Sequence, residues 1–120
     1  MSRILLLEDD PDTGEAICAM LAALGHSADW VRNGQEAIVH IQAHPAPDLV
    51  LTDILMPGMD GLEAIQHLRV ALSEVPIIAM SAQVNAPYLQ AAAVFGARVT
   101  LPKPFTLEVL KAAIAKVMGG

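Results

Sequence analysis

Four short apolar runs and one more polar segment, each followed by a stretch with helical periodicity, constrain the fold of this chain more than any other feature. Each of the four runs is continuous and ends at a break, as buried strands do. We expect strands at residues 3–7, 27–31, 49–52, 77–80 and 99–101, and helices at about 12–24, 34–44, 61–72, 86–95 and 107–118. Strands that alternate with helices form a parallel sheet covered on both faces by right-handed crossovers. The sequence therefore predicts an α/β fold, a doubly wound (βα)5 five-stranded parallel sheet, with the more polar second strand at an edge.

Capping signals mark the starts of three of the expected helices. Asp12, with Glu15 three residues later, is expected to cap the first helix, and Asp10 is the other candidate. Asn33 and Glu36 have the spacing of a capping box at the start of the second, and Thr106 is expected to cap the last.

Size, charge and cysteine content limit the compartment and the partners. The chain is expected to be one domain, residues 1–120, that is either the whole protein or a piece cut from a longer one. The net charge of −6 and the lack of a basic stripe argue against direct binding to nucleic acid or to an anionic membrane. No apolar run approaches the roughly 20 residues of a membrane span, and no signal peptide is recognisable. The single cysteine, Cys18, is typical of a reducing compartment, so we expect a cytoplasmic protein.

Polar side chains with complementary chemistry follow four of the expected strands. Glu8 and Asp9 follow the first, Asp53 the third, Ser81 the fourth and Lys103 the fifth. Because parallel strands end at the same edge of a sheet, these groups are expected to converge on one pocket. Carboxylates that repel one another are stabilised by a hard cation, and Mg2+ prefers a few carboxylates together with waters and a phosphate. The sequence therefore predicts a site for Mg2+ and a phosphoryl group.

The chemistry of these residue types suggests a role for each. Asp53 can act as the nucleophile toward phosphorus and form an aspartyl phosphate. The metal and Lys103 would neutralise the phosphoryl oxygens, and the Ser81 hydroxyl would donate a hydrogen bond to one of them. The Lys103–Pro104 peptide bond is a candidate for the cis form, which would aim the ammonium inward.

These motifs closely resemble the receiver domain of two-component response regulators, over nearly the whole chain. They are ILLLEDDP at residues 4–11, LTDILMPGMDG at 51–61, SA at 81–82, FGA at 95–97 and LPKPF at 101–105. The resemblance implies the flavodoxin-like strand order 2-1-3-4-5. It also implies a phosphoryl group accepted from the phosphohistidine of a sensor histidine kinase or phosphotransfer protein, slow self-hydrolysis, and control of a downstream output protein or domain. The chain would not be a conventional enzyme.

The resemblance also assigns roles to individual positions. The acidic pair falls on Glu8 and Asp9, and the phospho-acceptor on Asp53. The backbone carbonyl of Leu55 would complete the metal shell. Ser81 would be the switch hydroxyl and Lys103 the essential lysine.

One position departs from the family pattern. The family usually has an aromatic residue on the fifth strand, three positions before the lysine, and here that position is Thr100. We expect the signal to leave mainly through the start of the fourth helix, near residues 83–87. The resemblance also suggests a homodimer through the face formed by the fourth helix, the fifth strand and the last helix.

Two alternatives carry different functions. The first is a phosphorylation-independent, receiver-like module that only binds proteins; Thr100 favours it and the complete pocket argues against it. The second is a metal-dependent phosphohydrolase. That reading would need a carboxylate two residues after the nucleophile, where Leu55 stands instead.

Overall fold

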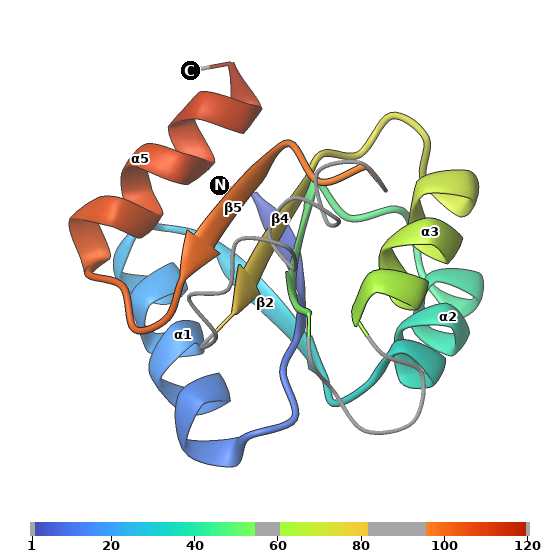
Figure 1. The fold of residues 1–120 in the computed structure, drawn as a ribbon, viewed down its shortest axis with the longest axis horizontal. Helices are drawn as coiled ribbons and strands as arrows, with labels where there is room; N and C mark the ends of the chain where they lie inside the picture. Colours follow the sequence, from blue (N-terminus) through green and yellow to red (C-terminus); the bar gives the residue numbers. More distant parts are fainter. Residues whose placement is uncertain (1, 55–60, 82–95, 120) are drawn as a thin grey trace.

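Five parallel strands form one sheet in the order β2-β1-β3-β4-β5 (Figure 1). The computed structural model describes residues 2–54, 61–81 and 96–119. The elements are β1 Arg3–Leu7, α1 Pro11–Ala23, β2 Ser27–Val31, α2 Gly34–Ala43, β3 Leu49–Asp53, α3 Gly61–Ala71, β4 Ile77–Ser81, β5 Val99–Pro102 and α5 Leu107–Met118. The expected α/β class and strand order are confirmed. The helix expected at residues 86–95 lies outside the described residues.

Strand register brings the ends of the central strands level with one another. Leu7 pairs with Thr52, Asp53 with Met80, and Ser81 with Pro102. The polar second strand, β2, lies at an edge of the sheet, as its composition predicts. The carboxyl ends of β1, β3, β4 and β5 therefore lie side by side at one edge of the sheet.

Helices cover both faces of the sheet, and each face has its own apolar cluster. Helices α1 and α5 lie on one side and α2 and α3 on the other (Figure 1). Within β1, Leu5 and Leu7 pack with α2 and α3, whereas Ile4 and Leu6 pack with α1 and α5. This alternation follows from the period of two residues along a strand. Cys18 is half-buried against the α1 and α5 layer, and burial raises the pKa of its thiol.

The cap of α1 is Asp10, and the assignment of Asp12 to this role is wrong. The Asp10 carboxylate accepts a hydrogen bond from the backbone N–H of Thr13 at 2.9 Å, while Asp12 is exposed in the first turn. The reason is Pro11, which occupies the first helical position, where a missing N–H costs nothing. The residue before the proline therefore becomes the cap.

The other two predicted caps are present. Asn33 accepts a hydrogen bond from the backbone N–H of Glu36 at 2.8 Å, and the Glu36 side chain accepts one from the backbone N–H of Arg32. Thr106 accepts a hydrogen bond from the backbone N–H of Val109. In the described parts of the chain, none of the helices combines the length and hydropathy that a membrane span requires.

Candidate functional site

The sheet edge brings four of the expected site residues to one place. Glu8 directly follows β1, Asp53 is the last residue of β3, Ser81 is the last residue of β4, and Lys103 directly follows β5. Asp9 comes next to Glu8 along the chain. Leu55, whose carbonyl is expected to bind the metal, lies outside the described residues.

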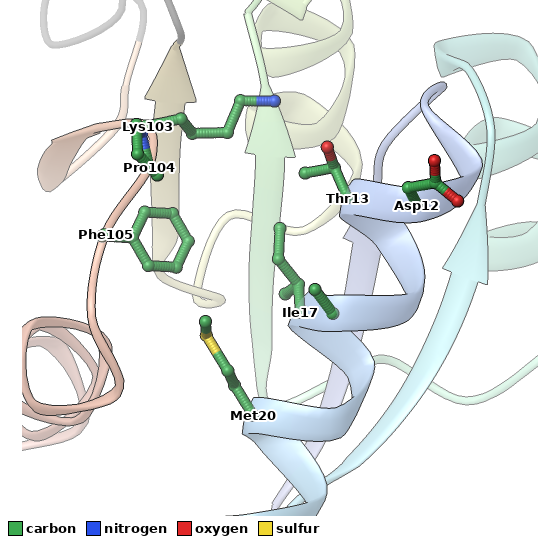
Figure 2. Close-up of a pocket in the computed structure, with 8 residues that line it drawn as sticks. Asp12, Thr13, Ile17, Met20, Lys103, Pro104 and Phe105 are labelled. Carbon is green, nitrogen blue, oxygen red and sulfur yellow. The ribbon is translucent and has the colours of Figure 1, made fainter.

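The Lys103 ammonium joins two buried carboxylates. It donates hydrogen bonds to Glu8 Oε1 at 2.7 Å and to Asp53 Oδ2 at 2.8 Å. The Glu8 side chain is fully buried, and that of Asp53 is 8% exposed. In Figure 2 the lysine side chain extends from the segment after β5 toward the end of the green strand, β3. The lysine therefore serves as the counter-ion of both carboxylates.

Three carboxylates form a group that fits a hard cation. Glu8, Asp9 and Asp53 each offer an oxygen, and these oxygens all lie within 4.8 Å of one another. With one ammonium among three carboxylates, the formal charge of the group is −3 + 1 = −2. Oxygen donors with this excess of negative charge match the preference of Mg2+ for a few carboxylates, with its remaining positions left to water or phosphate.

The pKa values of the buried pair follow from burial and from their hydrogen bonds. Burial raises the pKa of Glu8, against the opposing effect of its hydrogen bonds from Lys103 and from the backbone N–H of Asp10. Burial by itself would lower the pKa of Lys103, but the hydrogen bonds to Asp53 and Glu8, together with the negative charges of both carboxylates, outweigh it. The pKa of Lys103 is thereby raised above its ordinary value, so this side chain is positively charged at neutral pH.

Ser81 and Thr100 occupy the neighbouring strands β4 and β5. Ser81 is buried, and its carbonyl accepts a hydrogen bond from the backbone N–H of Lys103 at 2.7 Å. This bond fixes the start of the segment that carries the lysine. Thr100 is half-buried on β5 and pairs with Ala79 of β4. The aromatic position of the family thus holds a short, β-branched side chain with a stiff χ1 angle.

A groove of about 440 Å³ lies beside the site, between α1 and the segment after β5 (Figure 2). Lys103 and Pro104 are joined by a cis peptide bond, as the sequence suggested. Across the groove, Phe105 faces the α1 residues Ile17 and Met20. Sequence reasoning missed this groove, although apolar residues on α1 and directly after the Lys-Pro pair were the signal for it.

Trp30 was also missed as a neighbour of the site. Its indole N–H donates a hydrogen bond to the backbone carbonyl of Glu8 at 2.8 Å. The signal in the sequence was a lone tryptophan in an otherwise polar edge strand.

Comparison with known proteins agrees with this fold. The family model of the response regulator receiver domain matches residues 4–115. The response regulator MprA of Mycolicibacterium vanbaalenii is 37% identical over 110 residues, which are 92% of this chain and 47% of that protein. MprA of Mycobacterium leprae is 34% identical over 116 residues, 97% of this chain and 50% of that protein. The chain therefore spans about half the length of these curated relatives.

Two solved structures have the same fold over nearly their whole length. A two-component response regulator from Clostridium difficile gives a TM-score of 0.91 at 26% identity, covering 99% of this chain and 97% of that one. The receiver domain of the sensor histidine kinase PA1611 from Pseudomonas aeruginosa gives a TM-score of 0.90 at 30% identity, covering 99% and 98%. That domain was crystallised with a magnesium ion coordinated in its active site cleft. This chain belongs to the response regulator receiver domain family.

Proposed function

We propose that this chain is a phosphorylation-controlled signalling switch that accepts a phosphoryl group on Asp53 in a Mg2+-dependent reaction. The observation that supports it most is the Lys103 ammonium, which contacts the buried carboxylates of Glu8 and Asp53 together. A cation held at a nucleophilic carboxylate stabilises the negative charge that a transferring phosphoryl group brings. The reading as a phosphorylation-independent binding module does not explain this arrangement.

Each residue of the site has a part in the proposed transfer. Glu8, Asp9, Asp53 and the carbonyl of Leu55 would hold Mg2+, which neutralises charge on the phosphoryl oxygens when it is bound. A carboxylate oxygen of Asp53 attacks phosphorus; the new O–P bond forms as the N–P bond of a phosphohistidine breaks, and the histidine keeps the electron pair. Lys103 and Ser81 then contact the phosphoryl oxygens. Water hydrolyses the aspartyl phosphate slowly and resets the switch, so the chain is not a turnover enzyme.

The proposed partners follow from the site and from the family. A sensor histidine kinase or phosphotransfer protein would donate the phosphoryl group, and an output protein or domain would read the change. The apolar groove between α1 and Phe105 begins at Lys103 and so offers contact surface beside Asp53. We place the protein in the cytoplasm, with no direct contact to nucleic acid or membrane.

The output surface stays a prediction. Two predictions involve residues outside the described part of the chain. One is a homodimer through the fourth helix, β5 and α5, and the other is a signal that leaves near residues 83–87. Thr100 is within it, and its short side chain is the reason to expect a readout without a rotating aromatic ring.

The proposed function predicts a metal-dependent adduct on the native chain. After incubation with acetyl phosphate and Mg2+, intact-mass analysis should show one phosphoryl group per chain, and an excess of chelator present from the start should prevent the adduct from forming. The physical reason is that three carboxylates and one lysine leave the site too negative to accept a phosphate without the metal. A native chain that stays unmodified at saturating Mg2+ would refute the switch.

Mg2+ affinity should separate the ligand Asp9 from its exposed neighbour Asp12. Asp9→Ala removes one oxygen of the three-carboxylate group and should weaken Mg2+ binding at least tenfold, about 1.4 kcal/mol or more. Asp12→Ala removes an exposed carboxylate that is neither the helix cap nor in the group, and should leave the affinity almost unchanged. Calorimetric titration measures both. Equal losses of affinity in the two variants would mean that Mg2+ responds only to the overall charge of the protein and that Asp9 is not a ligand.

A further inference from the structure

Trp30 contacts the peptide that joins two proposed metal ligands. The carbonyl of Glu8, which accepts the indole N–H at 2.8 Å, belongs to the peptide bond between Glu8 and Asp9. The backbone N–H of Glu8 also donates to the carbonyl of Val31 at 3.0 Å. The first residue after β1 is therefore held on both sides of its Cα by hydrogen bonds to β2.

The position of the indole ring is fixed by its neighbours. Trp30 pairs with Leu6 of β1 in the sheet register and packs against the apolar cluster shared by α1 and α5. The ring lies directly on the backbone of α1, because a Cβ atom at Gly14 would be only 2.0 Å from the Trp30 Cζ2 atom. The Arg32 guanidinium carbon lies 5.4 Å from the ring centroid, within the range of a cation–π contact. A ring held in this way can orient the carbonyl to which it donates.

We propose that Trp30 is a positioning residue for the metal site: through its N–H···O=C bond it sets the orientation of the Glu8–Asp9 peptide, and thereby of both acidic side chains. This inference rests on the proposed function, because it assumes that Glu8 and Asp9 bind Mg2+. The physical basis is pre-organisation. A carboxylate pair that is already oriented gives up less freedom when the cation binds, and the difference appears as affinity.

Replacing the indole while keeping an aromatic ring tests the proposal. Trp30→Phe retains a ring that can pack near Gly14 but has no N–H donor. We expect Mg2+ affinity, measured by calorimetric titration, to fall about 3- to 10-fold, which is the range for losing one neutral hydrogen bond.

A stability control separates positioning from general loosening of the fold. Ile114→Val shortens a buried side chain of α5, far along the chain from the acidic pair, and should lower the unfolding free energy while leaving Mg2+ affinity unchanged. If Ile114→Val weakens Mg2+ binding as much as Trp30→Phe does, the effect is one of stability and the proposal is wrong. Native-like affinity in Trp30→Phe would equally overturn it.

A second measurement uses the native chain and does not depend on a variant. Trp30 is the only tryptophan, so its indole N–H gives one unambiguous NMR resonance. We expect that resonance to shift on saturation with Mg2+, because the carbonyl that accepts the indole N–H belongs to the peptide between Glu8 and Asp9, the two proposed metal ligands. A resonance unmoved while Mg2+ binds would overturn the role of Trp30 alone. If the native chain bound no Mg2+ at all, the proposed function would fail, and this inference with it.

Discussion

Asp53→Asn is expected to abolish the phosphoryl adduct completely while the protein stays folded. Asparagine has nearly the same shape as aspartate, but its amide is a very poor nucleophile toward phosphorus. Lys103 keeps its hydrogen bond to Glu8 in this variant, so its ammonium still has a buried carboxylate partner. The loss should therefore be chemical, and no part of it should come from unfolding.

The measurement is intact mass after incubation with acetyl phosphate and Mg2+, beside a thermal unfolding curve. Asp12→Asn is the matched control, since it makes the same chemical change at an exposed carboxylate that Lys103 does not contact. The control should take up one phosphoryl group, as the native chain does. An adduct of native yield on Asp53→Asn would place the acceptor at another residue.

Lys103→Ala is expected to slow adduct formation by about 100-fold, the usual cost of removing one preorganised electrostatic donor. The ammonium is the group that contacts both Glu8 and Asp53, and no other cation contacts them among the described residues. Lys103→Arg should restore little of the rate, because a planar guanidinium replaces a compact point charge. Intact mass recorded at successive times gives the rate of adduct formation for the native chain, Lys103→Ala and Lys103→Arg.

The same variant should change how stability depends on pH. Removing one partner of a buried ion pair costs roughly 3 kcal/mol, which a domain stable by about 5–15 kcal/mol can tolerate. Without the lysine, the pKa of Glu8 rises further above its ordinary value, since the hydrogen bond from Lys103 is the largest of the effects that lower it. The folded state then binds more protons than the unfolded state between the ordinary and the raised pKa. The free energy of unfolding should therefore fall as the pH rises through that window.

Denaturant unfolding at several pH values measures this effect. Metal-free Lys103→Ala should be more stable at mildly acidic pH than at neutral pH, and Mg2+ should restore the stability lost at neutral pH. A variant that is unfolded at every pH, with and without Mg2+, would show that Lys103 is structural.

The positions of the site residues could be predicted because strand ends are local features. Strands β1, β3 and β4 are short apolar runs that end at or directly before a candidate site residue, so the parallel sheet places Glu8, Asp53 and Ser81 at one edge. The strand order itself came from the resemblance to a family, because the order of parallel strands depends on crossover connections that leave no mark in any one segment.

Other contacts could not be predicted, because they depend on long-range packing. The Trp30 bond to Glu8 joins residues 22 positions apart and needs the register of β1 with β2 and the close approach of Gly14. The cap of α1 was misassigned for a more local reason. Asp10 and Asp12 both have capping side chains, and Pro11 between them decides the start of the helix.

The alternation of β1 between two apolar clusters limits how this protein can change in length. Inserting or deleting one residue in β1 would exchange Leu5 and Leu6 between the two helical layers, a swap of identical side chains, but it would also turn the residue that follows the strand to the opposite face of the sheet. It would also shift Glu8 by about 3.3 Å along the strand, and a displacement of that size would break its 2.7 Å hydrogen bond with Lys103. The number of residues in β1 is therefore constrained by the site as well as by the core. A strand one residue longer or shorter would not keep the ion pair between Glu8 and Lys103.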